Sequence, residues 1–322
     1  MKIKVLFLAL SACFVSTAYA QDTESYPSKP ITLIVSASPG GTTDLAARMI
    51  AEPLGKALGQ TIVVENKPGA AGSIAAQQLI KSRADGYTLL LQYSGFQVIT
   101  PSITKVNWDP VKDFKPVANV LSAPQVLVVK KNLPVNTLQE LINYAKERPG
   151  VLNYASSGNG SLQHVTTELL NQMAGIDTVH VPYSGTGPAL TDLIGGSVDF
   201  TITTPPPLLP HIQAGSLKPL VNTSNTKLKS LQDVPTASEA GLPDLLVSSW
   251  FAMYAPADTP DAIVNKLSSE IEKIMATPEY QEKAENLGAT AEYMNSEQLG
   301  KYTEQELDRW KQVIESAKIT SN

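Results

Sequence analysis

ITLIVSASPGGTTDLAARMI, residues 31–50, is the stretch that decides the fold class of this chain. Its first five residues are apolar or β-branched, as a buried strand requires, and Pro39-Gly40-Gly41 then breaks the run. Leu45, Met49 and Ile50 follow the break at helical spacing. The stretch therefore predicts a strand, a glycine loop and a helix in that order.

The same unit recurs along the chain. Apolar runs predict further strands at 62–64, 87–91, 126–129, 152–155, 178–181, 198–203, 218–223 and 247–255, and periodic stretches predict helices at 74–80, 137–146, 161–173 and 187–194. Thr137 and Glu140 have the spacing of a capping box. Strands that alternate with helices predict an α/β protein with mostly parallel sheets flanked by helices.

The C-terminal tail predicts how the chain is divided. Residues 259–318 read as helices without a strand among them, so we expect them to cover the first sheet. Lobe 1 would then consist of 21–123 plus 250–322, and lobe 2 of the inserted residues 124–249. Two chain crossings between the lobes would act as a hinge and permit closure of a cleft around a ligand.

The first twenty residues have the pattern of a secretory signal peptide. Lys2 and Lys4 precede an apolar run, and Ala18-Tyr19-Ala20 supplies small residues for cleavage after Ala20. A lipoprotein cleavage box that ends at Cys13, the single cysteine of the chain, is an alternative that remains open. We expect residues 1–20 to be removed and the mature chain to be periplasmic, without disulfides.

Composition excludes several classes of function. The 322 residues carry 30 acidic and 25 basic side chains, a formal charge of −5, and loss of Lys2 and Lys4 with the leader makes the balance more negative. Such a balance disfavours nucleic acid as a partner. No later segment reaches the run of about 18 apolar residues that a spanning helix needs. We expect a protein of about two domains that works as a monomer.

Three loops at predicted strand–helix junctions, 38–44, 156–161 and 183–188, are the candidate ligand site. Glycine lets backbone approach a ligand, and amides at a helix N-terminus favour an anion. Loops at the carboxyl ends of parallel strands meet in one crevice. The alternative for loop 38–44 is that it is only a turn and that Asp44 only caps the first turn of the helix. The candidate ligand-binding residues are Ser38, Gly40, Gly41, Thr42, Thr43, Asp44, Ser156, Ser157, Gly158, Ser161, His164, Tyr183, Ser184, Gly185 and Thr186.

Four further candidates lie outside these loops, namely Ser94, Phe96, Gln97 and Asp199. Phe96, between Ser94 and Gln97, would present an aromatic face to a ligand, and packing in the core is the alternative. Asp199 would anchor a loop amide across the cleft, or remain a strand-end carboxylate. The sequence lacks a Gly-x-Ser-x-Gly elbow, a Gly-Lys-Ser/Thr phosphate loop and metal-ligand spacing of its three histidines. We therefore expect no catalytic residues, metal or cofactor.

Several motifs in one order resemble the Bug-type substrate-binding receptors of tripartite tricarboxylate transporters. They are residues 31–48, 64–72, 85–90, 154–164 and 180–190. The resemblance implies a two-lobed periplasmic-binding-protein fold that holds a carboxylate by backbone amides, hydroxyls and bridging waters. It assigns this role to Ser38, Gly41, Thr42, Asp44, Ser157 and Thr186, with Asp44 orienting amides or water rather than touching the ligand. Residues 36–38 and 93–97 depart from the common family pattern.

The resemblance also implies what the receptor does. It would capture a small carboxylate and deliver it to the permease subunits of a tripartite tricarboxylate-type transporter. Phe96 favours an aromatic mono- or dicarboxylate such as terephthalate, whereas an aliphatic di- or tricarboxylate or an amino acid would use the same loops. A sensor that presents its ligand to a membrane histidine kinase is the first alternative. A secreted hydrolase is the second.

Overall fold

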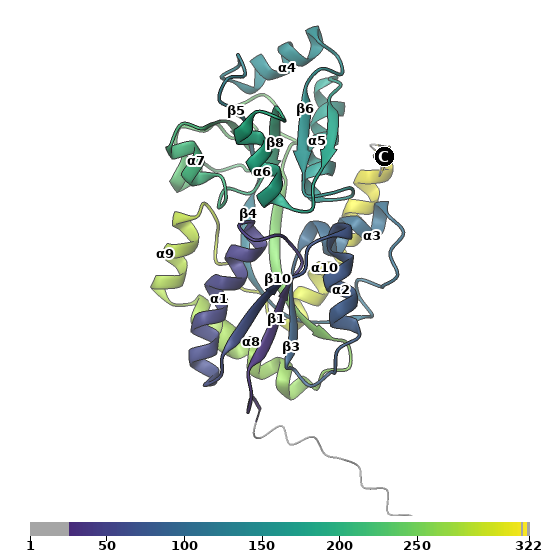
Figure 1. Cartoon of the computed structure of the whole chain (residues 1–322), viewed down its shortest axis with the longest axis vertical. Helices are drawn as coiled ribbons and strands as arrows, with labels where there is room; N and C mark the ends of the chain where they lie inside the picture. The colour runs from purple at the N-terminus through teal and green to yellow at the C-terminus, as the bar shows by residue number, and fades with distance from the viewer. Residues whose placement is uncertain (1–25, 317, 321–322) are drawn as a thin grey trace, which may run out of the picture.

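The computed structural model describes residues 26–316 and 318–320. The expected signal peptide, its cleavage site and Cys13 lie outside the described residues. The described chain forms two lobes stacked along the long axis (Figure 1), each built on a five-stranded sheet flanked by helices. The predicted two-lobed α/β fold is therefore confirmed.

The sheet of lobe 1 has the strand order β2-β1-β3-β10-β4. Strands β1, β2 and β3 are parallel, and β10 runs antiparallel to both β3 and β4. Four of the five strands therefore share one direction, as a mostly parallel sheet requires. The bounds are β1 (Ile31–Val35), β2 (Ile62–Asn66), β3 (Thr88–Tyr93), β4 (Phe114–Pro124) and β10 (Ser248–Pro256).

The sheet of lobe 2 repeats this arrangement in the order β7-β6-β8-β5-β9. Here β6 is parallel to β7 and β8, and β5 is the reversed strand between β8 and β9. In each sheet the reversed strand continues a chain crossing from the other lobe. The bounds are β5 (Val126–Lys130), β6 (Asn153–Ser156), β7 (Val179–Pro182), β8 (Phe200–Thr203) and β9 (Leu217–Asn222).

Helices cover both sheets (Figure 1). In lobe 1 they are α1 (Thr42–Leu58), α2 (Ser73–Ile80), α3 (Thr100–Ile103), α8 (Asp261–Met275), α9 (Pro278–Asn286) and α10 (Ser296–Ser316); in lobe 2, α4 (Leu138–Glu147), α5 (Leu162–Ala174), α6 (Thr186–Gly195) and α7 (Leu209–Gln213). Short helical turns are η2 (Ala70–Gly72), η3 (Gly95–Ile99) and η4 (Lys229–Leu231). Of the C-terminal helices, α8 and α10 pack on β4, so the tail contributes to lobe 1. Half of the predicted capping box is confirmed, because Thr137 Oγ1 accepts the Glu140 amide at 3.1 Å, whereas the Glu140 carboxylate accepts the amide of Asn136, one residue before the cap.

Burial on both faces explains the continuous apolar runs of the central strands. In β5, Leu127 and Val129 pack in one core of lobe 2, while Val126 and Val128 pack in another on the opposite face. Val126 to Val129 are all buried, so the alternation of polar and apolar residues that marks a half-buried strand is absent there. The crossing strands of the molecule are therefore rigid core elements rather than surface linkers.

The two chain crossings meet at one point. The first lies at Gln125, between β4 and β5, and the second lies beside Thr223 and Val247, between β9 and β10. The Gln125 amide donates to Thr223 Oγ1 at 2.9 Å and to the Val247 carbonyl at 3.3 Å. The Thr223 hydroxyl also donates to the Val247 carbonyl at 2.6 Å. The two chain crossings are thus hydrogen-bonded to each other and do not act as independent linkers.

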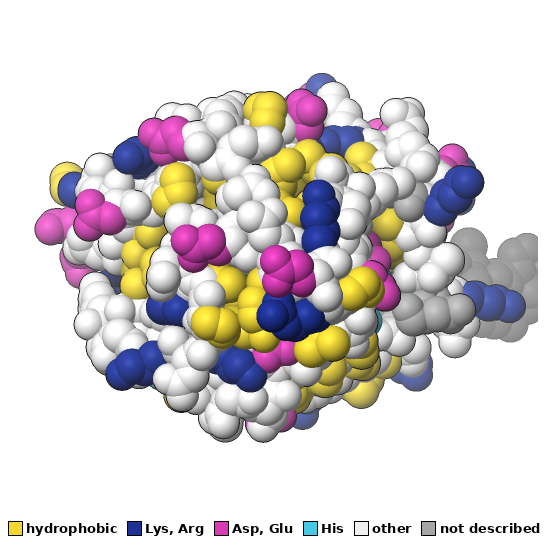
Figure 2. Space-filling view, turned by 90° about the horizontal axis from the view of Figure 1, so that it is seen from above, with side chains coloured by type: hydrophobic (Ala, Val, Ile, Leu, Met, Phe, Trp, Pro, Cys, Tyr) yellow, Lys and Arg dark blue, Asp and Glu magenta, His cyan; other side chains and the backbone are white. Residues whose placement is uncertain are grey.

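The outer face of lobe 2 carries charges of both signs. Seen from above (Figure 2), basic and acidic side chains are interspersed with apolar ones, and no single sign dominates this face. Within the described part of the chain, no helix has both the length and the apolar character needed to cross a membrane. The surface in this view therefore shows no anionic or cationic field that would select a highly charged partner.

One glycine fixes the position of the aromatic residue that the sequence singled out. Gly72 precedes α2 with φ of +82°, and a β-carbon there would lie 2.6 Å from Cδ2 of Phe96 in η3. Phe96 is buried and rests directly on the Gly72 backbone. The glycine therefore sets how far the ring of Phe96 lies from the interior of lobe 1.

Replacing Gly72 by alanine should lower stability more than replacing Gly196. The φ angles are +82° and +83°, so both alanines carry the same left-handed backbone cost of about 1 kcal/mol. No atom lies within 4 Å of the new methyl at Gly196. Because the methyl at Gly72 overlaps Phe96, we expect G72A to lose about 1–3 kcal/mol more in the free energy of unfolding than G196A in urea titrations. Equal losses would contradict the close packing of Phe96 on Gly72.

Candidate functional site

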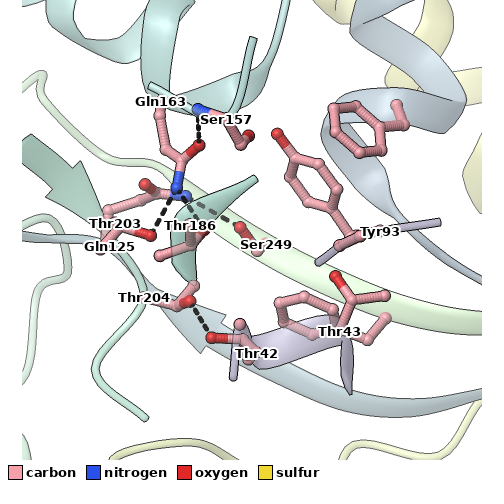
Figure 3. A pocket seen from close by; sticks show the side chains of 14 residues that line it. Thr42, Thr43, Tyr93, Gln125, Ser157, Gln163, Thr186, Thr203, Thr204 and Ser249 are labelled. Atoms are coloured by element: carbon pink, nitrogen blue, oxygen red, sulfur yellow. Dashed lines mark hydrogen bonds between the residues drawn. The ribbon is translucent and has the colours of Figure 1, made fainter. Parts of the chain in front are cut away.

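A pocket lies between the two lobes, beside the hinge (Figure 3). Its volume of about 20 Å³ is room for one or two water-sized groups, so the lobes are closed in this structure. Both lobes and both chain crossings contribute to its wall, and every side chain in it is uncharged. The lining residues are Ala37, Gly41, Thr42, Thr43, Tyr93, Phe96, Gln125, Ser157, Gln163, Thr186, Thr203, Thr204, Ser249 and Phe251.

Three helices begin at this pocket. Thr42 is the first residue of α1, Thr186 is the first of α6, and Gln163 lies in the first turn of α5. The residues before α1 and α6 are Gly41 and Gly185, and neither provides a side-chain cap. The first amides of these helices therefore keep their capacity to donate, and the positive ends of the helix dipoles face the same space. This arrangement favours an anion without using a cationic side chain.

Gln163 holds the lobe 2 wall together. Its Oε1 accepts the Ser157 amide at 2.7 Å, and its Nε2 donates to Thr203 Oγ1 at 2.6 Å and to Thr186 Oγ1 at 3.0 Å. One buried amide thus fixes residues from three separate elements of lobe 2 (Figure 3). Because these hydrogen bonds lie within one lobe, this wall can form before the lobes close.

Two buried polar atoms of the wall lack a hydrogen-bond partner among the described residues. Gln125 is 1% exposed and donates through Nε2 to Ser249 Oγ at 2.8 Å, but its Oε1 has no partner. Ser157 is 6% exposed, and its Oγ lies close enough to the Tyr93 hydroxyl to offset part of the rise that burial causes in the pKa of Tyr93, but it has no hydrogen-bond partner of regular geometry. A buried polar atom without a partner costs about 1–3 kcal/mol. Gln125 Oε1 can only accept a hydrogen bond, so a water or another donor, and not a carboxylate oxygen, would satisfy it.

An aromatic wall closes the opposite side. Tyr93 meets Phe96 edge to face, with ring centroids 4.6 Å apart, and stacks on Phe251 at 6.2 Å. Burial raises the pKa of Tyr93 to about 12, so its hydroxyl remains protonated at neutral pH. The Tyr93 hydroxyl accepts the Leu162 amide at 2.8 Å. Tyr93 therefore joins lobe 1 to the start of α5 in lobe 2.

Further contacts across the cleft hold the closed state. Thr42 and Thr204 share a hydrogen bond of 2.5 Å between their hydroxyls. The Ser38 hydroxyl donates to the Ser184 carbonyl at 3.2 Å, and the Thr100 hydroxyl donates to the Gly160 carbonyl at 3.2 Å. All of these pairs join a lobe 1 residue to a lobe 2 residue, so they are made only on closure.

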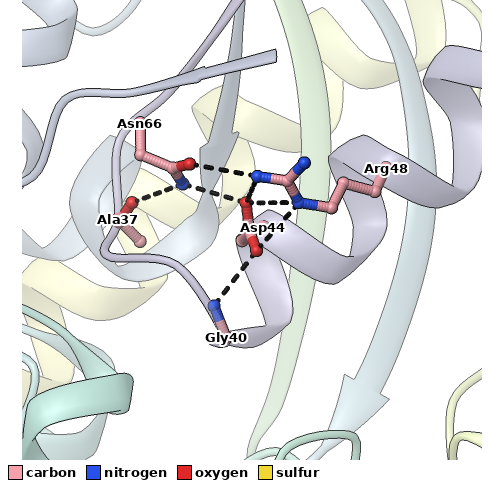
Figure 4. Close-up of polar contacts among 5 residues, drawn as sticks. All are labelled: Ala37, Gly40, Asp44, Arg48 and Asn66. Carbon is pink, nitrogen blue, oxygen red and sulfur yellow. Dashed lines mark hydrogen bonds and ion pairs between the residues drawn. The ribbon is translucent and has the colours of Figure 1, made fainter.

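Asp44 supports the first loop from behind (Figure 4). Its carboxylate accepts the Gly40 amide at 3.0 Å, the Asn66 amide group at 3.0 Å and the Arg48 guanidinium at 3.0–3.2 Å. Burial alone would raise the pKa of Asp44, but the hydrogen bonds from Arg48, Gly40 and Asn66 outweigh it and lower that pKa. Asn66 also donates to the Ala37 carbonyl at 3.0 Å. The hydrogen bonds of the Asp44 carboxylate therefore stabilise the loop, and Asp44 does not line the pocket.

The structure brings most of the sequence-predicted residues to the cleft. Gly41, Thr42, Thr43, Phe96, Ser157 and Thr186 line the pocket itself. Ser38 and Gly185 lie where the lobes meet, Gly40 binds Asp44, and Ser161 caps α5 by accepting the His164 amide at 3.3 Å. Gly158, Tyr183 and Ser184 line a neighbouring cavity. The Ser156 hydroxyl bonds His180 Nε2 at 2.6 Å.

Four predicted residues lie away from the pocket. The Ser94 hydroxyl accepts the Trp250 amide at 3.4 Å, and Gln97 donates to the Pro110 carbonyl at 2.7 Å. Asp199 precedes β8, at the end opposite Thr203, where it pairs with Lys130 at 2.6 Å and accepts the Asn153 amide at 2.8 Å.

His164 is the fourth of these residues. It stacks on His180 with centroids 4.1 Å apart, and burial lowers its pKa to about 4. Its Nδ1 accepts the Gly160 amide at 3.2 Å. His164 therefore has a packing role in lobe 2, with its ring directed away from the pocket wall.

Sequence reasoning missed eight lining residues, namely Ala37, Tyr93, Gln125, Gln163, Thr203, Thr204, Ser249 and Phe251. The rule that ligands bind at the carboxyl ends of strands points to Thr203, the last residue of a predicted strand, and to Thr204, which follows it. Gln125, Ser249 and Phe251 belong to the chain crossings, where no local pattern marks a binding residue. The hinge itself is therefore part of the pocket.

Comparison with known proteins agrees with this geometry. A family model described as the tripartite tricarboxylate transporter family receptor matches residues 46–319. The Bordetella pertussis protein BugT is 36% identical over 315 residues, which are 95% of this chain and 96% of that protein.

Solved structures with the same fold include the periplasmic binding protein BugD, at 32% identity and a TM-score of 0.88 over 92% of this chain and 99% of that one. A Rhodopseudomonas palustris protein solved with adipate has 36% identity and a TM-score of 0.89, with 92% and 99% of the two chains covered. MatC from the same organism, solved with bound malate, has 33% identity and a TM-score of 0.85, with 90% and 100% covered.

The family match covers most of the chain, and its members are substrate-binding receptors rather than enzymes. A hydrolase is therefore excluded by family. The resemblance inferred from the glycine loops is confirmed: the chain belongs to the receptor family of the tripartite tricarboxylate transporters.

Proposed function

We propose that this protein is a periplasmic receptor that captures a small carboxylate by closure of its lobes and delivers it to the permease subunits of a tripartite tricarboxylate-type transporter. The observation that carries the proposal is the convergence of three helix starts on a pocket without a charged side chain, where the first amides of α1 and α6 have no side-chain cap. Two related structures, solved with adipate and with malate, hold carboxylates and support the same ligand class.

Neutral donors perform the recognition. The first amides of α1 and α6 and the hydroxyls of Thr43 and Ser157 offer hydrogen bonds to carboxylate oxygens, and the helix dipoles compensate the negative charge. Asp44 faces the back of the same loop with its charge matched by Arg48. The pocket therefore attracts an anion although an acidic residue lies in the first turn of α1.

The aromatic wall decides what is attached to the carboxylate. Phe96 and Tyr93 form an edge-to-face pair at the pocket, and a ligand ring that lies against them gains the same kind of contact. An aromatic mono- or dicarboxylate, with terephthalate as the example, fits this wall better than an aliphatic acid. The proposed preference for an aromatic carboxylate therefore rests on Phe96.

Carboxylates should stabilise the protein against heat, whereas their neutral amides should not. A ligand that binds only the folded state adds about 2.7 kcal/mol at a hundredfold excess over its dissociation constant. Terephthalate, benzoate, adipate and malate would be compared with terephthalamide and benzamide in a thermal-shift screen, after ligand retained from the cell is removed by unfolding and refolding. Shifts as large with the amides as with the acids would refute carboxylate recognition.

Phe96→Leu should weaken aromatic acids selectively. Loss of the edge-to-face contact removes about 0.5–1.5 kcal/mol, which is about 2- to 13-fold in affinity for terephthalate measured by calorimetry. Adipate affinity should change by less than about twofold, because an aliphatic chain has no ring quadrupole to lose. Phe114→Leu is the matched control, since Phe114 is a buried lobe 1 aromatic that packs on Trp108 and Tyr254 and does not line the pocket. Equal losses for terephthalate and adipate would remove the preference for aromatic ligands.

Asp44→Asn should weaken all carboxylates to a similar degree, because it loosens the loop that presents the α1 amides. At neutral pH the variant should lose about 1–2 kcal/mol in the free energy of unfolding. The folded pKa of Asp44 lies below its unfolded value, so this contribution is complete above about pH 4 and disappears as the pH falls through the folded pKa. Urea titrations at several pH values would measure it.

The matched control for Asp44 is Glu52→Gln, which removes an exposed acid from the same helix. We expect that control to leave affinity unchanged. A difference between wild type and Asp44→Asn that persists undiminished in strong acid would contradict a role for the ionised carboxylate.

A further inference from the structure

A second cavity of about 420 Å³ lies beside the pocket in the same cleft. Lobe 1 contributes residues 69–71, Ser73, Gln77 and residues 104–107 to its wall, and lobe 2 contributes residues 157–159 and 182–184. Ser157 lines both the pocket and this cavity. The serine with the unpartnered hydroxyl is therefore the boundary between two adjoining spaces.

Because the pocket and the cavity differ in size, they can hold different parts of one ligand. The pocket, at about 20 Å³, has room for a carboxylate group and for the nearest atoms of the ring or chain attached to it, which lie against Phe96 and Tyr93. The neighbouring cavity falls within the range of about 300–1,000 Å³ that is usual for small-molecule sites. A ligand whose carboxylate occupies the pocket of the closed protein must therefore extend past Ser157 into the cavity.

Backbone strain is concentrated on the wall of this cavity. Four successive residues, Gly69 to Gly72, have positive φ angles of 117°, 46°, 46° and 82°. Ala70 and Ala71 carry β-carbons, for which the left-handed conformation is unfavourable. Strained backbone tends to persist where function requires a particular shape. On the same wall Thr104 Oγ1 is buried without a hydrogen-bond partner among the described residues.

One charged side chain lines the cavity. Lys105 is exposed, and within residues 26–316 and 318–320 it has no ion-pair partner. The pocket wall is uncharged, so Lys105 is the cationic group that the lining of the two adjoining spaces offers to a ligand. A flexible ammonium at the rim suits a carboxylate whose distance from the first one varies.

The geometry points to a distal subsite in this cavity, where Lys105 recognises a second carboxylate. The inference rests on the proposed function, since it takes the first carboxylate to lie in the pocket. The ligand class becomes a dicarboxylate whose two acid groups are separated by a ring or a chain, with the spacer passing Ser157.

Lys105→Met tests this subsite, because it removes the charge and keeps an unbranched side chain. Affinities for terephthalate and benzoate, which differ by one carboxylate, would be measured by calorimetry on refolded, ligand-free protein. We expect the variant to bind terephthalate about fivefold more weakly and benzoate as wild type does, as for loss of one exposed ion pair. Lys112→Met is the matched control, because Lys112 is exposed on the following loop and pairs with Asp109 outside both spaces.

The possible outcomes distinguish a failure of the subsite from a failure of the proposed function. Wild-type protein that binds benzoate as tightly as terephthalate would overturn the subsite and leave carboxylate binding intact. Equal losses for both ligands in Lys105→Met, or no loss for either, would overturn it as well. If none of terephthalate, benzoate, adipate and malate binds wild type, the proposed function fails together with the subsite.

Discussion

The closed structure depends on backbone packing against backbone across the cleft. A β-carbon on Gly187 would lie 2.6 Å from the Pro39 carbonyl oxygen, and one on Gly185 would lie 2.8 Å from the Ser38 hydroxyl. Such distances are far shorter than side chains tolerate, and a carbonyl held in a packed loop cannot move aside. Only glycine permits the lobes to come this close. The same approach brings the starts of α1 and α6 to one pocket, so the anion site exists only because these positions lack side chains.

An uncharged wall follows from this packing and has consequences for specificity. A cationic side chain in so small a space would need a partner in the open, unliganded state, whereas helix amides remain neutral and need none. The single nearby acid, Asp44, is neutralised from behind by Arg48, Asn66 and the Gly40 amide. Its charge therefore shapes the loop without repelling an anion. Selection among carboxylates then depends on the aromatic wall and on the space beyond Ser157.

The strand–loop–helix pattern predicts both lobes and the three loops, because each unit is encoded within about twenty neighbouring residues. Strand β4 was missed because Lys115, Pro116 and Asn119 interrupt its apolar pattern, and its pairing with β10 joins residues more than a hundred positions apart. Asp199 was misplaced because it stands at the amino end of β8, whereas the crevice lies at the carboxyl end. His164 follows Gln163 in α5, and one step along a helix turns a side chain by about 100°, away from the pocket.

Gln125 could not be predicted from local pattern, yet it links the hinge to the ligand. Its backbone amide bonds the second chain crossing at Thr223 and Val247, while its side chain bonds Ser249 and faces the pocket. The hydrogen bonds between the lobes, such as Thr42 with Thr204, exist in the closed state whether or not ligand is bound. A ligand can shift the balance toward closure only by contacts that the open state lacks. The first amides of α1 and α6 offer such contacts, because closure brings them into one small pocket where a carboxylate can accept their hydrogen bonds. Closure without a ligand therefore leaves a cost that the right carboxylate removes.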